Sequence, residues 1–198
     1  MKTSLSINKI FLICFFVSLV YAVIRYHVYN DISWLQLPLW TTNKACGVTA
    51  LMLIGLSVSL PNHHPRRKIG LFGVYIALLH VLLSLILLKP AYYPKFFLIN
   101  EQFSLVGELA ILAGILSFAV LIIAVHKSYP KFNSAENANL AVIKQCNIAF
   151  LLFSILHMIA MATDSWFSIS NWPGYLPPIS MLSALLCCYF LLYLRIKK

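Results

Sequence analysis

The stretch FSLVGELAILAGILSFAVLIIAV, residues 103–125, decides the class of fold. Its only charged side chain is Glu108, and it exceeds the run of about 20 mostly apolar residues with which a helix crosses the hydrocarbon core of a bilayer. Five more stretches have the same character, at residues 8–28, 44–60, 69–88, 140–162 and 179–195. The sequence therefore predicts an all-α membrane protein, a six-transmembrane-helix bundle that forms a single domain over residues 1–198.

The composition agrees with lipid as the main solvent of the chain. Hydrophobic residues make up 61% of the sequence and charged residues 10%, a balance that a water-soluble domain of this size could not hide behind its surface. All nine prolines fall between the apolar stretches, where they interrupt no helical hydrogen bond: Pro38, Pro61, Pro65, Pro90, Pro94, Pro130, Pro173, Pro177 and Pro178. The apolar stretches are therefore expected to be continuous helices.

The uneven distribution of lysine and arginine predicts the orientation. Because cytoplasmic loops retain positive charge, both termini are expected in the cytoplasm. The cytoplasmic set of cations is Lys2, Lys9, Arg66, Arg67, Lys68, Lys127, Lys131, Lys144, Arg195, Lys197 and Lys198, and the opposite set is Arg25, Lys44, Lys89 and Lys95. The net charge of +10 thus indicates membrane topology, and we expect contact with membrane lipid and no nucleic-acid partner.

Three ionisable side chains within the predicted spans are candidates for function, because such groups are costly in lipid. His80 lies twelve residues beyond Lys68 and His157 lies thirteen beyond Lys144, so each imidazole is expected roughly 18–20 Å from the cytoplasmic face. Two imidazoles at one depth on parallel helices can bind one haem iron from opposite sides. Alternatively, each histidine forms an ordinary hydrogen bond to a neighbouring helix. The third candidate, Glu108, is either a proton carrier or an interfacial side chain.

Small residues surround both histidines in the sequence. Gly73 and Ala77 precede His80 on its helical face, and Ser154 and Ala160 flank His157. These neighbours are expected to leave room for a flat macrocycle. The spacing of Gly107, Ala110 and Gly114 predicts that the fourth span approaches a neighbouring helix closely.

Three further charged residues are possible accessories to such a site. Arg25 and Lys44 lie near the outer ends of the first two spans, where cations can pair with haem propionates or a quinone headgroup, or simply anchor the helices. Asp164 follows His157 by seven residues on the same face and is either an orienting group or a solvated helix-end residue.

Two consecutive runs carry a resemblance to a known family: GVTALMLIGLSVSLP at Gly47–Pro61 and RRKIGLFGVYIALLH at Arg66–His80. Over residues 44–162 the chain resembles the ferric-reductase-like transmembrane domain family, and in particular its YedZ/MsrQ branch of haem-binding membrane subunits. The resemblance implies one haem b with His80 and His157 as its iron ligands. It also implies a multi-pass protein of the bacterial inner membrane that serves a periplasmic reductase.

The sequence departs from that family at one ligand position. The family carries an inner histidine about thirteen residues before His157, where this chain has Lys144-Gln145-Cys146-Asn147. A second haem would need another ligand there, such as the Cys146 thiolate or His126. We expect a single haem.

These patterns predict a redox carrier subunit of an oxidoreductase system. Electrons would come from quinol or a cytoplasmic flavin reductase, with FMN or quinone as a possible additional cofactor, and would pass through the His80/His157 haem to a periplasmic reductase or to ferric iron. The alternative is a cofactor-free helical membrane protein, either a small transporter or an assembly partner.

Overall fold

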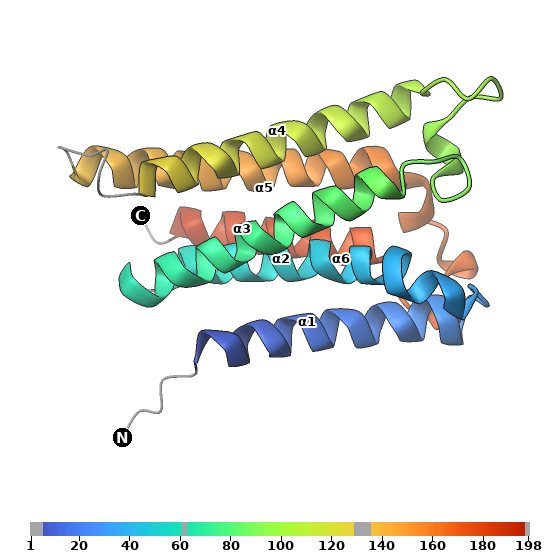
Figure 1. Cartoon of the computed structure of the whole chain (residues 1–198), viewed down its shortest axis with the longest axis horizontal. Coiled ribbons are helices and arrows are strands. Elements are labelled where there is room, and N and C mark those ends of the chain that lie inside the picture. The colour runs from blue at the N-terminus through green and yellow to red at the C-terminus, as the bar shows by residue number, and fades with distance from the viewer. Residues whose placement is uncertain (1–5, 61–62, 129–135, 197–198) are drawn as a thin grey trace. The chain divides into compact units, whose positions relative to one another are not determined.

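The computed structural model of the chain describes residues 6–60, 63–128 and 136–196 (Figure 1). Six α-helices dominate this part of the chain: α1 (Ile7–Val23), α2 (Thr42–Ser59), α3 (His63–Ile86), α4 (Leu105–Ser128), α5 (Glu136–Trp166) and α6 (Ile179–Ile196). Each helix covers one of the six apolar stretches of the sequence and differs from it by a few residues at its ends. Short 3-10 and π-helical turns occupy the connections.

Within the described residues, five helical segments are long and apolar enough to cross a membrane: Ile7–Val28, Arg66–Ile86, Leu105–Ser128, Ala141–Trp166 and Pro173–Ile196. The chain is therefore a helical protein of the multi-pass membrane type. Helix α2 is not among these five segments, so the prediction of six spans is confirmed only in part. The two ends of the chain, residues 1–5 and 197–198, lie outside the described residues, and the cytoplasmic position of both termini stays a prediction.

The structure shows why α2 is less apolar than the other helices. Most of its side chains are buried, and it packs against both α1 and α3. Three of its buried side chains are polar, namely Asn43, Thr49 and Ser57. The hydroxyl groups of Thr49 and Ser57 donate to the carbonyls of Ala45 and Ile54 of the same helix. The Asn43 amide donates to the Ser84 hydroxyl of α3. A helix enclosed by protein can carry polar residues at a lower cost than one that faces lipid, because hydrogen bonds within the helix and to its neighbours satisfy them.

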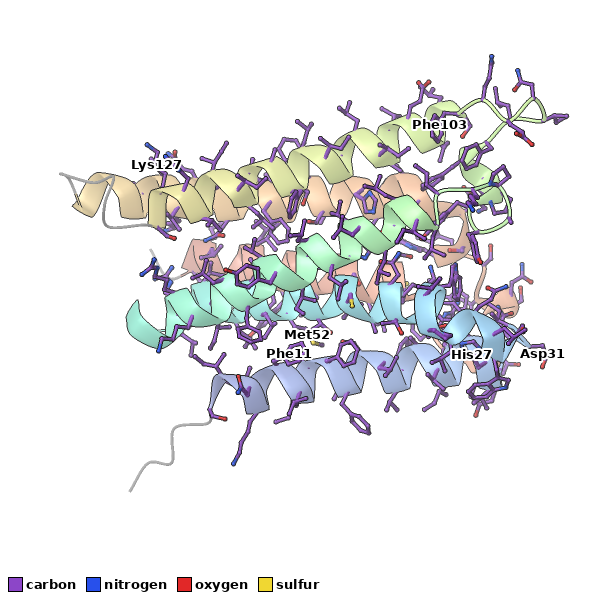
Figure 2. All side chains as sticks on the ribbon, in the orientation of Figure 1. Phe11, His27, Asp31, Met52, Phe103 and Lys127 are labelled. Carbon is purple, nitrogen blue, oxygen red and sulfur yellow. The ribbon has the colours of Figure 1, made fainter. Side chains whose placement is uncertain are left out.

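The chain divides into two compact units. Unit 1 comprises residues 1–88 and 168–179, and therefore contains α1, α2 and α3. Its core cluster joins Cys14, Leu53 and Ile69, and Phe11 of α1 and Met52 of α2 both pack against it (Figure 2). Unit 2 comprises residues 89–167 and 180–198, with α4 packed against α5. The single domain expected from the sequence stays a prediction.

Local signals set the helix ends. Helix α1 begins after Ser6, whose hydroxyl accepts from the Lys9 amide, and α2 ends before Leu60, which is extended as expected for a residue that precedes proline. The hydroxyl of Ser104 accepts from the Gly107 amide at 3.1 Å and so caps the start of α4.

Candidate functional site

His80 of α3 is held by α2 within unit 1. Its Nδ1 atom lies 2.9 Å from the carbonyl oxygen of Asn43. Because a carbonyl only accepts, Nδ1 donates the proton, and in the neutral ring Nε2 carries the lone pair. The ring lies directly over Gly47, where a Cβ atom would come within 3.1 Å of Cε1. The glycine thus makes room for the imidazole, and the Asn43 carbonyl sets its tautomer and orientation.

His157 of α5 is held in the same way by α4 within unit 2. Its Nδ1 atom donates to the carbonyl oxygen of Ala110 at 2.7 Å. The ring lies over Gly114, where a Cβ atom would be 3.3 Å from Nδ1. In each unit the accepting carbonyl therefore belongs to the residue four positions before the glycine that contacts the histidine.

The two helix pairs share their register beyond the histidines. In unit 1, Ala50 lies three residues after the glycine and Ala77 three residues before the histidine. In unit 2, Ser117 and Ser154 hold the same two positions, and all four residues are buried. The two serine hydroxyls are 2.9 Å apart. The pairs α2–α3 and α4–α5 therefore present one histidine each from an equivalent position, although the sequence shows no internal repeat that would predict this.

The small residues near the histidines serve helix packing. A Cβ atom at Gly73 would lie 2.7 Å from Cγ1 of Ile54, so this glycine allows close contact between α3 and α2. Gly107 faces the backbone of Phe96 in the loop before α4. Gly114 faces His157, and this confirms the expected close approach of the fourth span to another helix. The room expected beside Gly73 for a macrocycle is instead filled by α2.

Asn43 is a site residue that the sequence analysis missed. Besides its carbonyl contact with His80, its side-chain amide donates to the hydroxyl of Ser84 at 3.0 Å. Asn43 is buried and thus links α2 to α3 at two points. An amide side chain next to the apolar stretch at 44–60 is a signal that could have identified it, because a buried amide requires hydrogen-bond partners.

Glu108 and Asp164 lie at exposed positions of unit 2. Glu108 stands in the first turn of α4, where a carboxylate interacts favourably with the helix dipole. Asp164 forms an ion pair with Lys95, with 3.4 Å between the carboxylate oxygen and the ammonium nitrogen, and both side chains are exposed. In the described part of the chain, the structure records no interaction between His157 and either of these carboxylates.

Arg25 and Lys44 gather with aromatic side chains at one end of unit 1. Arg25 is buried in the π-helical turn Ile24–Val28 that continues α1, and it donates to the carbonyl of Leu176. The ammonium nitrogen of Lys44 lies 4.3 Å from the ring centroid of Trp40.

His27, which the sequence analysis also missed, is buried at the same end of unit 1 (Figure 2). It donates from Nδ1 to the Ile32 carbonyl at 2.8 Å and accepts at Nε2 from the Thr41 hydroxyl at 2.7 Å. Both ring nitrogens therefore have protein partners, so His27 is a structural histidine.

The described residues contain no group of three or more histidine, cysteine, aspartate or glutamate side chains that could hold a metal ion. All five cysteines are unpaired thiols, and Cys146 is buried. This finding leaves the proposed bis-histidine ligation untested, because haem iron takes only two axial ligands from the protein.

Comparisons with known proteins add no family to this picture: no protein-family model matches the chain, and no curated protein matches it. The resemblance to the ferric-reductase-like transmembrane domain family therefore stays a prediction, which rests on Gly47–Pro61 and Arg66–His80.

Proposed function

We propose that the chain is a haem b-containing membrane electron-transfer subunit in which His80 and His157 would hold the haem iron. The observation that supports this proposal most is the shared geometry of the two histidines. Each one donates from Nδ1 to a backbone carbonyl of the preceding α-helix and lies over a glycine of that helix. Two such arrangements, one in each unit, are expected if both histidines serve one chemistry.

The hydrogen bonds prepare both side chains for ligation. A histidine that binds a metal commonly donates its second ring nitrogen to a carbonyl or a carboxylate, which fixes the tautomer, orients the ring and raises the basicity of the ligating nitrogen. In His80 and His157 this leaves Nε2 as the nitrogen with the lone pair. The glycines allow each ring to pack tightly against a helix, so little side-chain entropy remains to be lost on ligation. When bound, the haem would accept and release single electrons.

The topology and the partners belong to the same proposal. We take the six helices as six spans with both termini in the cytoplasm of a bacterium, because the cations of the loops favour that orientation. Quinol or a cytoplasmic flavin reductase would donate electrons, directly or through FMN or quinone, and a periplasmic reductase or ferric iron would accept them. Protein around α2 explains how a helix of lower hydropathy can take part in such a bundle.

A reduced-minus-oxidised absorption spectrum tests the proposal. The full chain is purified in detergent with haem supplied, together with the variants His80→Ala and His157→Ala and the control His126→Ala. We expect sharp b-type bands in the parent and the control and their loss in both test variants.

Two results would contradict the proposal. A parent chain that lacks haem bands would exclude the bis-histidine haem and favour a cofactor-free membrane protein. Test variants that keep the bands would exclude His80 and His157 as the ligands and indicate a haem bound elsewhere. Circular dichroism of each variant distinguishes the loss of a ligand from the loss of the fold, because unfolding would remove the helical signal as well.

A further inference from the structure

A buried arginine, Arg25, lies in the turn that continues α1. Arg25 is only 6% exposed, because the turn Ile24–Val28 directs it into unit 1. One of its terminal nitrogens donates to the Leu176 carbonyl, and the guanidinium carbon lies 5.5 Å from the ring centroid of Tyr26. Its Nε atom is buried and lacks a hydrogen-bond partner in the described part of the chain. A buried N–H group without a hydrogen-bond partner destabilises the fold, and more so when it is charged, so a missing partner is expected.

A second cation lies beside this arginine. Lys44, in the first turn of α2, places its ammonium nitrogen 5.4 Å from the ring centroid of Tyr26, and the guanidinium carbon of Arg25 lies 5.5 Å from the same centroid. Lys44 also lies over Trp40, whose ring meets Tyr26 edge-on at 4.7 Å. Tyr26, Trp40 and Lys44 are half-buried, so this cation cluster of Arg25 and Lys44 is accessible from the Lys44 side.

The charge of the cation cluster is not compensated by the described chain. In the described part of the chain, the structure records no ion pair of a carboxylate with Arg25 or Lys44, and the ion pair that it records in unit 2 joins Lys95 to Asp164. Asp31, the acidic residue nearest to Arg25 in the sequence, is exposed and pairs with neither cation. Aromatic rings and a carbonyl offer partial negative charge to the two cations. A water molecule could bond to Nε, but it could not offset two like charges, and an anion could.

We propose that the cation cluster of Arg25 and Lys44 binds the phosphate of an anionic phospholipid. Phosphate oxygens can accept from the Arg25 guanidinium in a strong charge-assisted hydrogen bond, and the Lys44 ammonium over the same Tyr26 ring adds a second positive charge. The cluster lies at the end of the membrane-spanning segment Ile7–Val28, and tyrosine and tryptophan beside it are typical of the headgroup level.

Nearby apolar side chains favour a lipid over a free phosphate. Ile24 and Val28 of the same turn, and Leu39 before α2, are exposed large hydrophobic residues. They offer acyl chains a surface next to the cations. A soluble anion would leave them uncovered.

Lipid titration followed by native mass spectrometry tests this proposal. The haem-free full chain is stripped of lipid in detergent and titrated with dioleoylphosphatidylglycerol or, for comparison, dioleoylphosphatidylcholine. We expect the parent to bind the anionic lipid preferentially, and Arg25→Gln and Lys44→Gln each to bind it about tenfold more weakly, because each loses one positive charge of the cluster. Lys95→Gln, which removes an exposed cation of unit 2, should bind as the parent does.

The design separates binding from folding and from the proposed haem. Lys44→Gln leaves the contact of Arg25 with Leu176 intact, so it loses lipid affinity even if Arg25→Gln proves unstable. Equal binding of the two lipids, or parent-like binding by both variants, would overturn the proposal. So would equally tight binding of glycerol phosphate, which would identify a soluble-anion site. Displacement of the lipid when haem is loaded would overturn it too, because a haem propionate would then be the anion.

Discussion

The contact between Gly47 and His80 leads to a prediction about stability. In Gly47→Ala the new methyl group would lie 3.1 Å from Cε1 and 3.2 Å from Nδ1 of His80, closer than the 3.4 Å at which ordinary contact begins. The imidazole would have to move by a few tenths of an ångström, which lengthens its 2.9 Å hydrogen bond to the Asn43 carbonyl. Overpacking costs about 1–3 kcal/mol, whereas alanine gains about 1 kcal/mol of helix propensity over glycine. With a weakened hydrogen bond at about 1 kcal/mol, we expect a net loss of about 1–3 kcal/mol.

The control for this substitution lies on the same pair of helices. In Gly70→Ala the methyl group would meet only the Ser57 side chain, at 3.2 Å from its hydroxyl oxygen, which donates to the Ile54 carbonyl of its own helix. Because this contact involves one small side chain and no ring, the variant should lose less stability than Gly47→Ala. Unfolding in mixed micelles of a mild detergent and dodecyl sulfate gives the free energy of unfolding for both variants.

A double-mutant cycle identifies the clash. In a His80→Ala background the Gly47→Ala change should cost nothing, because no ring remains for the methyl group to meet. The equivalent cycle with Gly114 and His157 should show a smaller coupling energy, since that methyl group would lie 3.3 Å from Nδ1. If Gly47→Ala were as stable as Gly70→Ala, or equally destabilising with and without His80, the ring would not lie over the glycine and the proposed positioning of His80 would be wrong.

Two further substitutions test contacts of single side chains. Thr41→Val removes the buried hydroxyl that donates to Nε2 of His27, so we expect the free energy of unfolding to fall by about 1–3 kcal/mol. Thermal or detergent unfolding measures this loss. Thr41→Ser keeps the hydroxyl and should cost less. Asp164→Asn breaks an exposed ion pair with Lys95 and should change the free energy of unfolding by at most about 1 kcal/mol, since exposed pairs contribute little. A larger loss for Asp164→Asn, or none for Thr41→Val, would contradict these assignments.

The helices could be predicted from the sequence, but the lower apolar content of α2 could not be explained from it. In lipid every backbone polar group must be satisfied within the segment, so apolar runs of sufficient length become helices, and prolines mark where they end. The structure accordingly has a helix over each predicted stretch. The apolar content of α2 depends on its surroundings, because Asn43, Thr49 and Ser57 are tolerated where other helices cover them.

The candidate site could be predicted only as a pair of residues. His80 and His157 stand out because ionisable groups are rare in apolar stretches. Their hydrogen-bond partners are backbone carbonyls of Asn43 and Ala110, and a carbonyl leaves no trace in the sequence because every residue has one. Gly73 was assigned to the surroundings of a cofactor and instead packs against a helix, since small residues serve either role.

The sequence by itself determined that this protein is helical and membrane-spanning in type, because hydropathy and proline placement are local properties that act within one segment. Only the tertiary structure decided which carbonyl each histidine meets, which glycine lies under its ring and which cations are left without an anion. Those features depend on the register between helices, and register is set by side-chain packing across distant segments of the chain.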